Sequence, residues 1–311
     1  MEKYKLNYIN KNINKLKYIK DNNILNNYKN VKINTKDYDK LNFRENGIEY
    51  VKINSKMTNI VKKLSNKNDI KLQNELEKNV EKFLINFLKS KSKDGIKNFP
   101  DNFTDILIVE SAIRNSDVKK FNIVDSKVNA AASWFHTDWW EGQSFTSMII
   151  SRFNWLKKLN KFGPKKYTEI SNLNEWSCYW DSKYVELINV WIPFSETTEA
   201  SPLIFSDLNN TEYNDIIPYT YKINFGPNKK DYYYEIATRL KYNKNQKLYT
   251  KKDMKIGEAI IFKSNKAPHT AILNNKIKIP RKSIEFRCLV FNFDREKSDN
   301  SLNKLYKSKN K

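Results

Sequence analysis

Two histidines and one aspartate are the residues of this chain best suited to chemistry. The 311 residues include only two histidines, His136 in the stretch WFHTDWW and His269 in the stretch KSNKAPHTAIL. Asp138 follows His136 by two positions, and residues i and i+2 of a strand point to the same face. An imidazole nitrogen and a carboxylate oxygen can therefore meet at one point, where His269 from a distant strand can join them.

Two histidines and one carboxylate on one face of a metal form the facial triad that is typical of non-haem Fe(II) sites. An isolated HxD triplet occurs by chance in many chains, and a single histidine is more often a structural residue than a ligand. Here both histidines lie at the ends of strand-like runs, and an arginine-bearing strand follows the second one. We therefore expect a metal site at His136, Asp138 and His269.

The segment IPRKSIEFRCLVF at 279–291 is typical of a strand with two different faces. Alternation places one polar set and one apolar set on opposite sides: Arg281, Ser283, Glu285 and Arg287, against Ile284, Phe286, Cys288 and Val290. The pattern does not say which face is buried. If the polar face lies inside a barrel, an arginine can bind a carboxylate bidentately and a serine can add a hydrogen bond. A solvent-facing edge with an internal Arg–Glu pair is the alternative.

The elements that must position these residues are one long helix and many short strands. Apolar residues recur at three- and four-residue spacing over 69–91, which predicts an amphipathic helix packed on a core. From about residue 104 the pattern changes to short β-branched and aromatic runs. We predict an α+β fold with a sandwich or barrel of antiparallel strands. We expect a mostly helical supporting region over 1–100, the core over 101–296 and a basic tail over 297–311.

Composition excludes several classes of protein. The six glycines form no GxGxxG or GxxxxGK[ST] motif, which argues against Rossmann and P-loop nucleotide sites. The formal charge is +22, but the lysines are spread along the chain rather than clustered in a nucleic-acid-binding motif. We find no apolar run of membrane-spanning length, no secretory signal and no disulfide framework in the two cysteines. These features favour a cytoplasmic protein that is not embedded in a membrane.

The combination HxD…H…RxS resembles the Fe(II)/2-oxoglutarate-dependent dioxygenases. The runs INVWIPF, SPLIFSD, IGEAIIFKSNKAPHTA and RKSIEFRCLVF are most similar to the phytanoyl-CoA dioxygenase-like branch, over roughly residues 125–293. The resemblance implies a double-stranded β-helix (jelly-roll, cupin-like) core with Fe(II) at the triad and 2-oxoglutarate and O2 as cosubstrates. It also implies an arginine that holds the distal carboxylate of 2-oxoglutarate. Arg281 with Ser283 matches the RxS form, and Arg287 matches relatives that use a later arginine.

The resemblance extends to neighbouring residues. Asn189 is similar to a polar position that often contacts the cosubstrate. Trp134, Trp139 and Trp140 adjoin the triad, and we expect one of the latter pair to line a substrate pocket. Because halogenating relatives lack the carboxylate that Asp138 supplies, hydroxylation or another oxidation is the expected reaction.

The substrate is expected to be a small or carrier-linked molecule, and the basic charge favours an anionic one. A catalytically silent jelly-roll that binds nucleic acid or another polyanion through its lysines is the main alternative. A zinc hydrolase with Glu141 as base is a third interpretation. The sequence leaves the oligomeric state open.

Overall fold

A computed structural model gives the structure of the chain. It describes the following residues: 2–9, 18–19, 26–66, 69–92, 105–115, 128–129, 133–140, 143–150, 155, 158–159, 184–195, 197–199, 201–225, 231–272 and 279–292. The α-helices in this part of the chain are α1 (Phe43–Asn46), α2 (Ser55–Asn66), α3 (Ile70–Ser92) and α4 (Phe145–Ile150). Most of the other regular structure is β-strand. The expected tail at 297–311 lies outside the described residues.

Six strands form the largest sheet. Their order is β4 (Ile48–Lys52), β12 (Glu258–Lys263), β7 (Tyr184–Pro193), β14 (Lys282–Asn292), β5 (Asp105–Asn115) and β6 (Val128–Asn129). Neighbouring strands are antiparallel, except that β5 and β6 are parallel. In the centre of the sheet, Arg287 of β14 pairs with Asn189 of β7, and Glu285 pairs with Trp191. This register brings polar residues of two strands side by side on one face.

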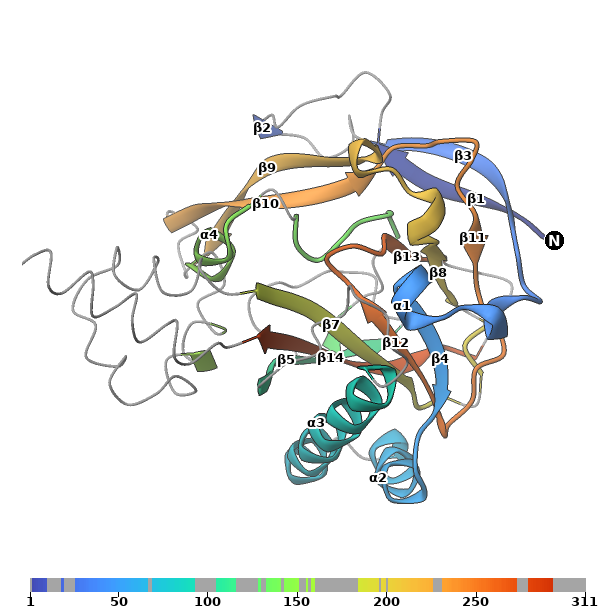
Figure 1. Ribbon diagram of the computed structural model, residues 1–311, viewed down its shortest axis with the longest axis vertical. Coiled ribbons are helices and arrows are strands. Elements are labelled where there is room, and N and C mark those ends of the chain that lie inside the picture. Colours follow the sequence, from blue (N-terminus) through green and yellow to red (C-terminus); the bar gives the residue numbers. More distant parts are fainter. Residues whose placement is uncertain are drawn as a thin grey trace, which may run out of the picture.

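The remaining strands form smaller sheets. One has the order β11 (Leu248–Tyr249), β8 (Leu203–Ser206), β13 (His269–Ala271), and another the order β10 (Asp231–Leu240), β9 (Ile216–Phe225), β2 (Tyr18–Ile19). β1 (Glu2–Ile9) pairs with β3 (Asn26–Ile33). Figure 1 shows β9 and β10 on one side of the large sheet and α2 and α3 on the other. Two facing layers of mainly antiparallel strands are the arrangement of a jelly-roll, as the sequence predicted.

Helices α2 and α3 cover the outer face of the large sheet. The fully buried residues of α3 are Leu76, Val80, Leu84 and Leu88, at the predicted helical spacing. They belong to one apolar cluster with residues of α2, β7, β12 and β14. Asp69 caps α3, because its Oδ1 accepts a hydrogen bond of 2.8 Å from the backbone nitrogen of Lys71. The helix predicted over 69–91 is therefore confirmed.

Both faces of β14, the polar one and the apolar one, lie in the interior of the protein. Ile284, Phe286 and Cys288 pack under the helices with no exposed surface. Glu285 is only 6% exposed on the opposite face, which lies inside the jelly-roll. The alternative of a solvent-facing polar edge is therefore wrong, because a second layer of strands covers this face.

The N-terminal region contributes more than helices. Strand β4 pairs with β12 and so belongs to the same sheet as the core strands. β1 and β3 pack Leu6, Tyr8 and Val31 against Phe135, which lies just before the triad in sequence. The boundary at residue 100 remains a prediction, but strands on both sides of it share one sheet.

The structure also bears on membrane-spanning helices and on the cysteines. No helix in the described ranges has the length and apolar character needed to cross a membrane. Cys288 is a free, fully buried thiol, and burial raises its pKa above the usual range. Cys178 lies outside the described residues.

Candidate active site

His136, Asp138 and His269 meet inside the jelly-roll. Their potential ligand atoms all lie within 4.8 Å of one another. His136 Nε2 is 4.0 Å from Asp138 Oδ1, and His269 Nε2 is 3.9 Å from Asp138 Oδ2. Metal–ligand bonds of about 2.0–2.2 Å place adjacent ligands about 3 Å apart, so small side-chain rotations bring these three atoms onto one ion.

Backbone pairing holds the two histidines together. The backbone nitrogen of His136 donates to the carbonyl oxygen of His269 at 3.1 Å, and that of His269 donates back at 2.9 Å. His269 also pairs with Phe205 in the β13–β8 ladder. His136 forms an isolated bridge rather than part of a strand, and the backbone nitrogen of Asp138 donates to the carbonyl oxygen of Ser264 at 2.8 Å. The side chains thus converge as predicted, through a bridged loop and not through strand alternation.

The histidine rings are oriented for coordination by Nε2. His136 Nδ1 lies 2.9 Å from the carbonyl oxygen of Trp134, and His269 Nδ1 lies 3.1 Å from that of Ala267. A carbonyl oxygen can only accept, so each Nδ1 carries the hydrogen and each Nε2 keeps a lone pair. Burial, and then the neighbouring His269, lower the pKa of His136 to about 3, against the attraction of Asp138. His136 is therefore neutral at pH 7, as a metal ligand must be.

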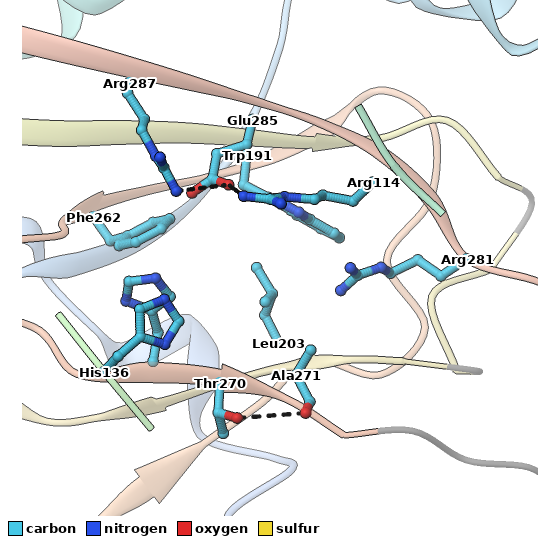
Figure 2. Close-up of a pocket in the computed structure, with 11 residues that line it drawn as sticks. Arg114, His136, Trp191, Leu203, Phe262, Thr270, Ala271, Arg281, Glu285 and Arg287 are labelled. Carbon is cyan, nitrogen blue, oxygen red and sulfur yellow. Dashed lines mark hydrogen bonds and ion pairs between the residues drawn. The ribbon is translucent and has the colours of Figure 1, made fainter. Parts of the chain in front are cut away.

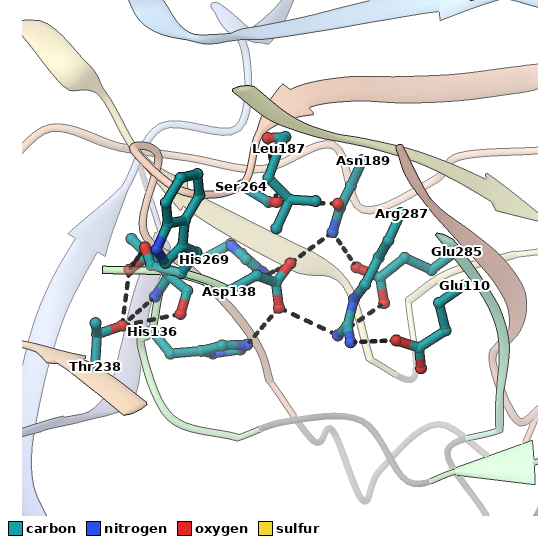
Figure 3. A network of polar contacts seen from close by, with 12 residues as sticks. Glu110, His136, Asp138, Leu187, Asn189, Thr238, Ser264, His269, Glu285 and Arg287 are labelled. Carbon is teal, nitrogen blue, oxygen red and sulfur yellow. Dashed lines mark hydrogen bonds and ion pairs between the residues drawn. The ribbon is translucent and has the colours of Figure 1, made fainter. Parts of the chain in front are cut away.

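The Asp138 carboxylate is held on both oxygens. Asn189 Nδ2 donates to Asp138 Oδ2 at 2.7 Å, and Arg287 lies 3.1 Å from Asp138 Oδ1 (Figure 3). The amide of Asn189 is itself fixed, because its Oδ1 accepts from Ser264 Oγ at 2.9 Å. Burial disfavours the charge on Arg287, but Asp138, Glu110 and Glu285 outweigh it and raise the pKa of Arg287. The predicted metal ligands therefore fit a divalent cation: two imidazoles that each present Nε2 and one oriented carboxylate.

A cavity of about 390 Å³, its open mouth included, adjoins the two histidines. Figure 2 shows His136 at one end of it and Arg281 at the other. The described residues that line it are Arg114, His136, Trp191, Leu203, Phe262, His269, Thr270, Ala271, Arg281, Glu285 and Arg287. The lining combines apolar residues with three arginines and one glutamate, which suits a small anionic molecule.

Arg281 is the charged group at the far end of the cavity. It is 1% exposed, and its guanidinium carbon lies 5.4 Å from the centre of the Trp191 ring. One of its nitrogens donates to the carbonyl oxygen of Ser201 at 2.7 Å. Burial, and then repulsion by Arg114, lower the pKa of Arg281 to about 9, although Glu285 opposes this. A buried cation with a lowered pKa is a favourable partner for an incoming carboxylate.

Two buried hydroxyls accompany Arg281. Ser283 Oγ and Ser201 Oγ have no hydrogen-bond partner among the described residues. Orphaned buried hydroxyls are uncommon unless a ligand or water satisfies them. Arg281 and Ser283, the RxS pair of the sequence, therefore fit the carboxylate of a bound 2-oxoglutarate.

The three tryptophans predicted to adjoin the site have different surroundings. Trp139 packs in an apolar cluster with Phe145 and donates its Nε1 to the carbonyl oxygen of Gln143 at 3.2 Å. Trp134 lies with its ring centre 6.0 Å from that of His136. Trp140 is half-buried, and its Nε1 has no hydrogen-bond partner in the described part of the chain. Among the described residues, Trp191 is the tryptophan that lines the cavity. Glu141 lies outside the described residues.

Sequence reasoning did not assign a role to Arg114, Glu110 or Glu285. Glu110 accepts from Arg287 at 2.9 Å, and Arg114 lies 3.4 Å from a carboxylate oxygen of Glu285. Alternation in the segment 279–291 puts Glu285 on the polar face of its strand, and this is the feature of the sequence that points to it. Arg114 and Glu110 lie on β5, whose pairing with β14 brings them to the site.

Comparisons with known proteins find similar sequences over part of the chain. A family model described as an oxidoreductase/YMDC permease-like domain matches residues 172–291. The hydroxylase/desaturase asaB of Aspergillus flavus is 29% identical over 126 residues, a stretch that covers 34% of this chain and 54% of that protein. The match thus spans about half the length of this curated relative.

Solved structures share the fold over nearly the whole chain. One structure of the iron and alpha-ketoglutarate-dependent endoperoxidase NvfI, described as having a different conformation, has a TM-score of 0.62 at 14% identity. It covers 94% of this chain and 98% of that one. A second structure of that enzyme has a TM-score of 0.56 at 14% identity, with 94% and 98% covered.

The chain therefore has the double-stranded β-helix fold that the sequence resemblance implied. Inside this fold, the structure brings His136, Asp138 and His269 together as a cluster that could hold a metal ion. The phytanoyl-CoA dioxygenase-like branch remains a prediction.

Proposed function

We propose that the protein is an Fe(II)- and 2-oxoglutarate-dependent oxygenase that hydroxylates a small molecule. One observation carries the proposal: His136, Asp138 and His269 lie at one end of a cavity whose other end holds the buried Arg281. A metal chelate of 2-oxoglutarate needs this arrangement, with a cation site at one end and a cation for the distal carboxylate at the other. When bound, Fe(II) with 2-oxoglutarate and O2 supplies the oxidation, with succinate and CO2 as co-products.

The protein's own residues supply binding and orientation. His136, Asp138 and His269 would hold the iron and leave its opposite positions open. Arg281 and Ser283 would bind the distal carboxylate. Arg287 was the second candidate for this role, but its contacts are with Asp138 and Glu110, so Arg281 is better placed.

The walls of the cavity would exclude water from the reacting centre. Phe262 packs its ring 4.8 Å from that of His269, and Trp191 lies beside Arg281. We infer a small substrate because the cavity is small, and an anionic one because arginines outnumber carboxylates among its lining residues. Trp134, Trp139 and Trp140 keep their predicted substrate role as a hypothesis, and so does a cytoplasmic location.

The test is succinate formation from 2-oxoglutarate with Fe(II) and O2, in the presence of candidate substrates. The His136→Ala variant removes one ligand and should abolish turnover. The matched control is Lys82→Ala, an exposed position on α3 far from the site, which should retain wild-type turnover. Full activity of His136→Ala would refute the assignment.

A further inference from the structure

Glu285 is the one carboxylate among the described residues that line the cavity. Its neighbours in the cavity include three arginines, Arg114, Arg281 and Arg287. Figure 2 shows Glu285 between Arg287 and Arg114, with Arg281 beyond them. The carboxylate is 3.4 Å from Arg114, 4.0 Å from Arg287 and 2.6 Å from Asn189 Nδ2.

A carboxylate in this place needs a physical reason. A buried charge is costly unless it is paired and hydrogen-bonded. In a cavity that receives a dianion, it also repels the ligand. Glu285 therefore opposes the binding of 2-oxoglutarate, and its benefit must lie at another point of the site.

The contacts of Asn189 indicate where that benefit lies. The same Nδ2 group donates to Glu285 Oε1 at 2.6 Å and to Asp138 Oδ2 at 2.7 Å. Asn189 thus links the two carboxylates, and Glu285 fixes the direction in which the amide reaches Asp138. The negative charge of Glu285 also offsets the arginines that would otherwise repel a cation bound at Asp138.

We propose that Glu285 is a positioning residue that favours the metal at the expense of the dianion. Near the triad, Glu285 orients the amide of Asn189, which in turn orients Asp138. Its negative charge also lowers the positive potential that the arginines create there. Near Arg281, Glu285 pairs with Arg114 and repels a second carboxylate. The inference rests on the proposed function, because it takes the cation at the triad and the dicarboxylate at Arg281 as the two ligands.

The Glu285→Gln variant separates these effects because it removes the charge and keeps the size. We expect Mn(II), as a redox-stable probe of the cation site, to bind the metal-free variant about tenfold to a hundredfold more weakly than wild type. We expect 2-oxoglutarate to bind the metal-free variant more tightly, on the order of tenfold. Calorimetric titrations measure both constants, and circular dichroism checks that the variant is folded.

The decisive feature is that the affinities for Mn(II) and for 2-oxoglutarate are expected to change in opposite directions. A substitution that merely disturbs the fold weakens both ligands, and weakening of both, or no change in either, would overturn the inference. The matched control is Glu258→Gln, which removes a carboxylate that pairs with Lys251 at 2.6 Å and is not among the described residues that line the cavity. It should leave 2-oxoglutarate binding within about twofold of wild type, a change of roughly 0.4 kcal/mol.

The two proposals fail differently. If wild-type protein binds neither Mn(II) nor 2-oxoglutarate, the proposed function is refuted, and this inference with it. If wild type binds both but Glu285→Gln shifts both constants in the same direction, the proposed function stands and the inference is refuted.

Discussion

Asn189 Nδ2 lies 2.7 Å from Asp138 Oδ2, although the two residues are 51 positions apart in the sequence. Asn189 is fully buried on the central strand β7, and Asp138 lies on the loop that carries His136. The amide is fixed by Ser264 on one side and by Glu285 on the other. The side chain of Asp138, the acidic member of the proposed metal site, is therefore held by a residue of the central strand as well as by its own loop.

Substitution of Asn189 by alanine should weaken metal binding without removing any ligand. Groups that orient metal ligands typically contribute about tenfold to a hundredfold in affinity. We expect that loss for Mn(II), measured by calorimetry on the metal-free protein. Asn189→Asp should be at least as harmful, because it places a second carboxylate against Asp138 in a buried site. Unchanged affinity in Asn189→Ala would show that the loop positions Asp138 by itself.

Replacement of Arg281 by alanine should impair the binding of 2-oxoglutarate but not of the metal. Loss of one partner of a buried charged hydrogen bond costs about 2–5 kcal/mol, or about 30-fold or more in affinity. Arg281→Lys retains the charge but not the fork geometry of the guanidinium. Its affinity for 2-oxoglutarate should therefore lie between those of wild type and Arg281→Ala. Titration of 2-oxoglutarate in the presence of Mn(II) measures this, and an equal loss of Mn(II) affinity would contradict the division of roles.

The metal-free protein should lose stability as the pH falls below about 6.5. Burial and His269 lower the pKa of His136 to about 3 in the folded protein, whereas an unfolded histidine has a pKa of about 6.5. Between these values the unfolded chain binds more protons than the folded one, so stability increases with pH over this window. Melting temperatures from pH 4 to pH 8 should show the decrease. The decrease should be smaller in His136→Gln, and an identical pH profile would contradict the cause.

Helix α3 should contribute to stability through its buried face. Leu84 is fully buried in the cluster beneath the large sheet. Leu84→Ala should lower the free energy of unfolding by about 2–5 kcal/mol, as measured by urea denaturation. The exposed Lys82 on the same helix is the control, and its change to alanine should stay within about 0.5 kcal/mol. Equal effects at the two positions would mean that the helix does not pack on the core in solution.

The sequence predicted the triad because its residue types are scarce and specific. With two histidines in the chain, His269 was the available partner for the HxD pair. The helix at α3 was equally clear, because its apolar residues follow one helical face. The local geometry was less predictable: His136 and Asp138 converge through a bridge to His269, which depends on residues more than 130 positions away.

Long-range strand pairing determines the features of the site that the sequence pattern does not predict. The roles of Glu285 and Arg114 depend on the register of β14 with β7 and β5, which no local pattern encodes. Arg281 and Arg287 could not be separated from sequence either, since both lie on the same face of one strand. In the folded protein Arg287 contacts Asp138, which supports the proposal that Arg281 binds the cosubstrate. Strands β1 and β3 were obscured by their lysine and asparagine content.

The most direct test of the central claim is an anaerobic titration of the metal-free protein with 2-oxoglutarate, with and without Fe(II), on wild type and His269→Ala. Iron and 2-oxoglutarate bound together have a visible charge-transfer absorption that neither gives alone with the protein. We predict this absorption in wild type only when both are present, and its loss in His269→Ala. Its absence in wild type, or its full retention in the variant, would contradict the assignment of His269 and of the oxygenase centre.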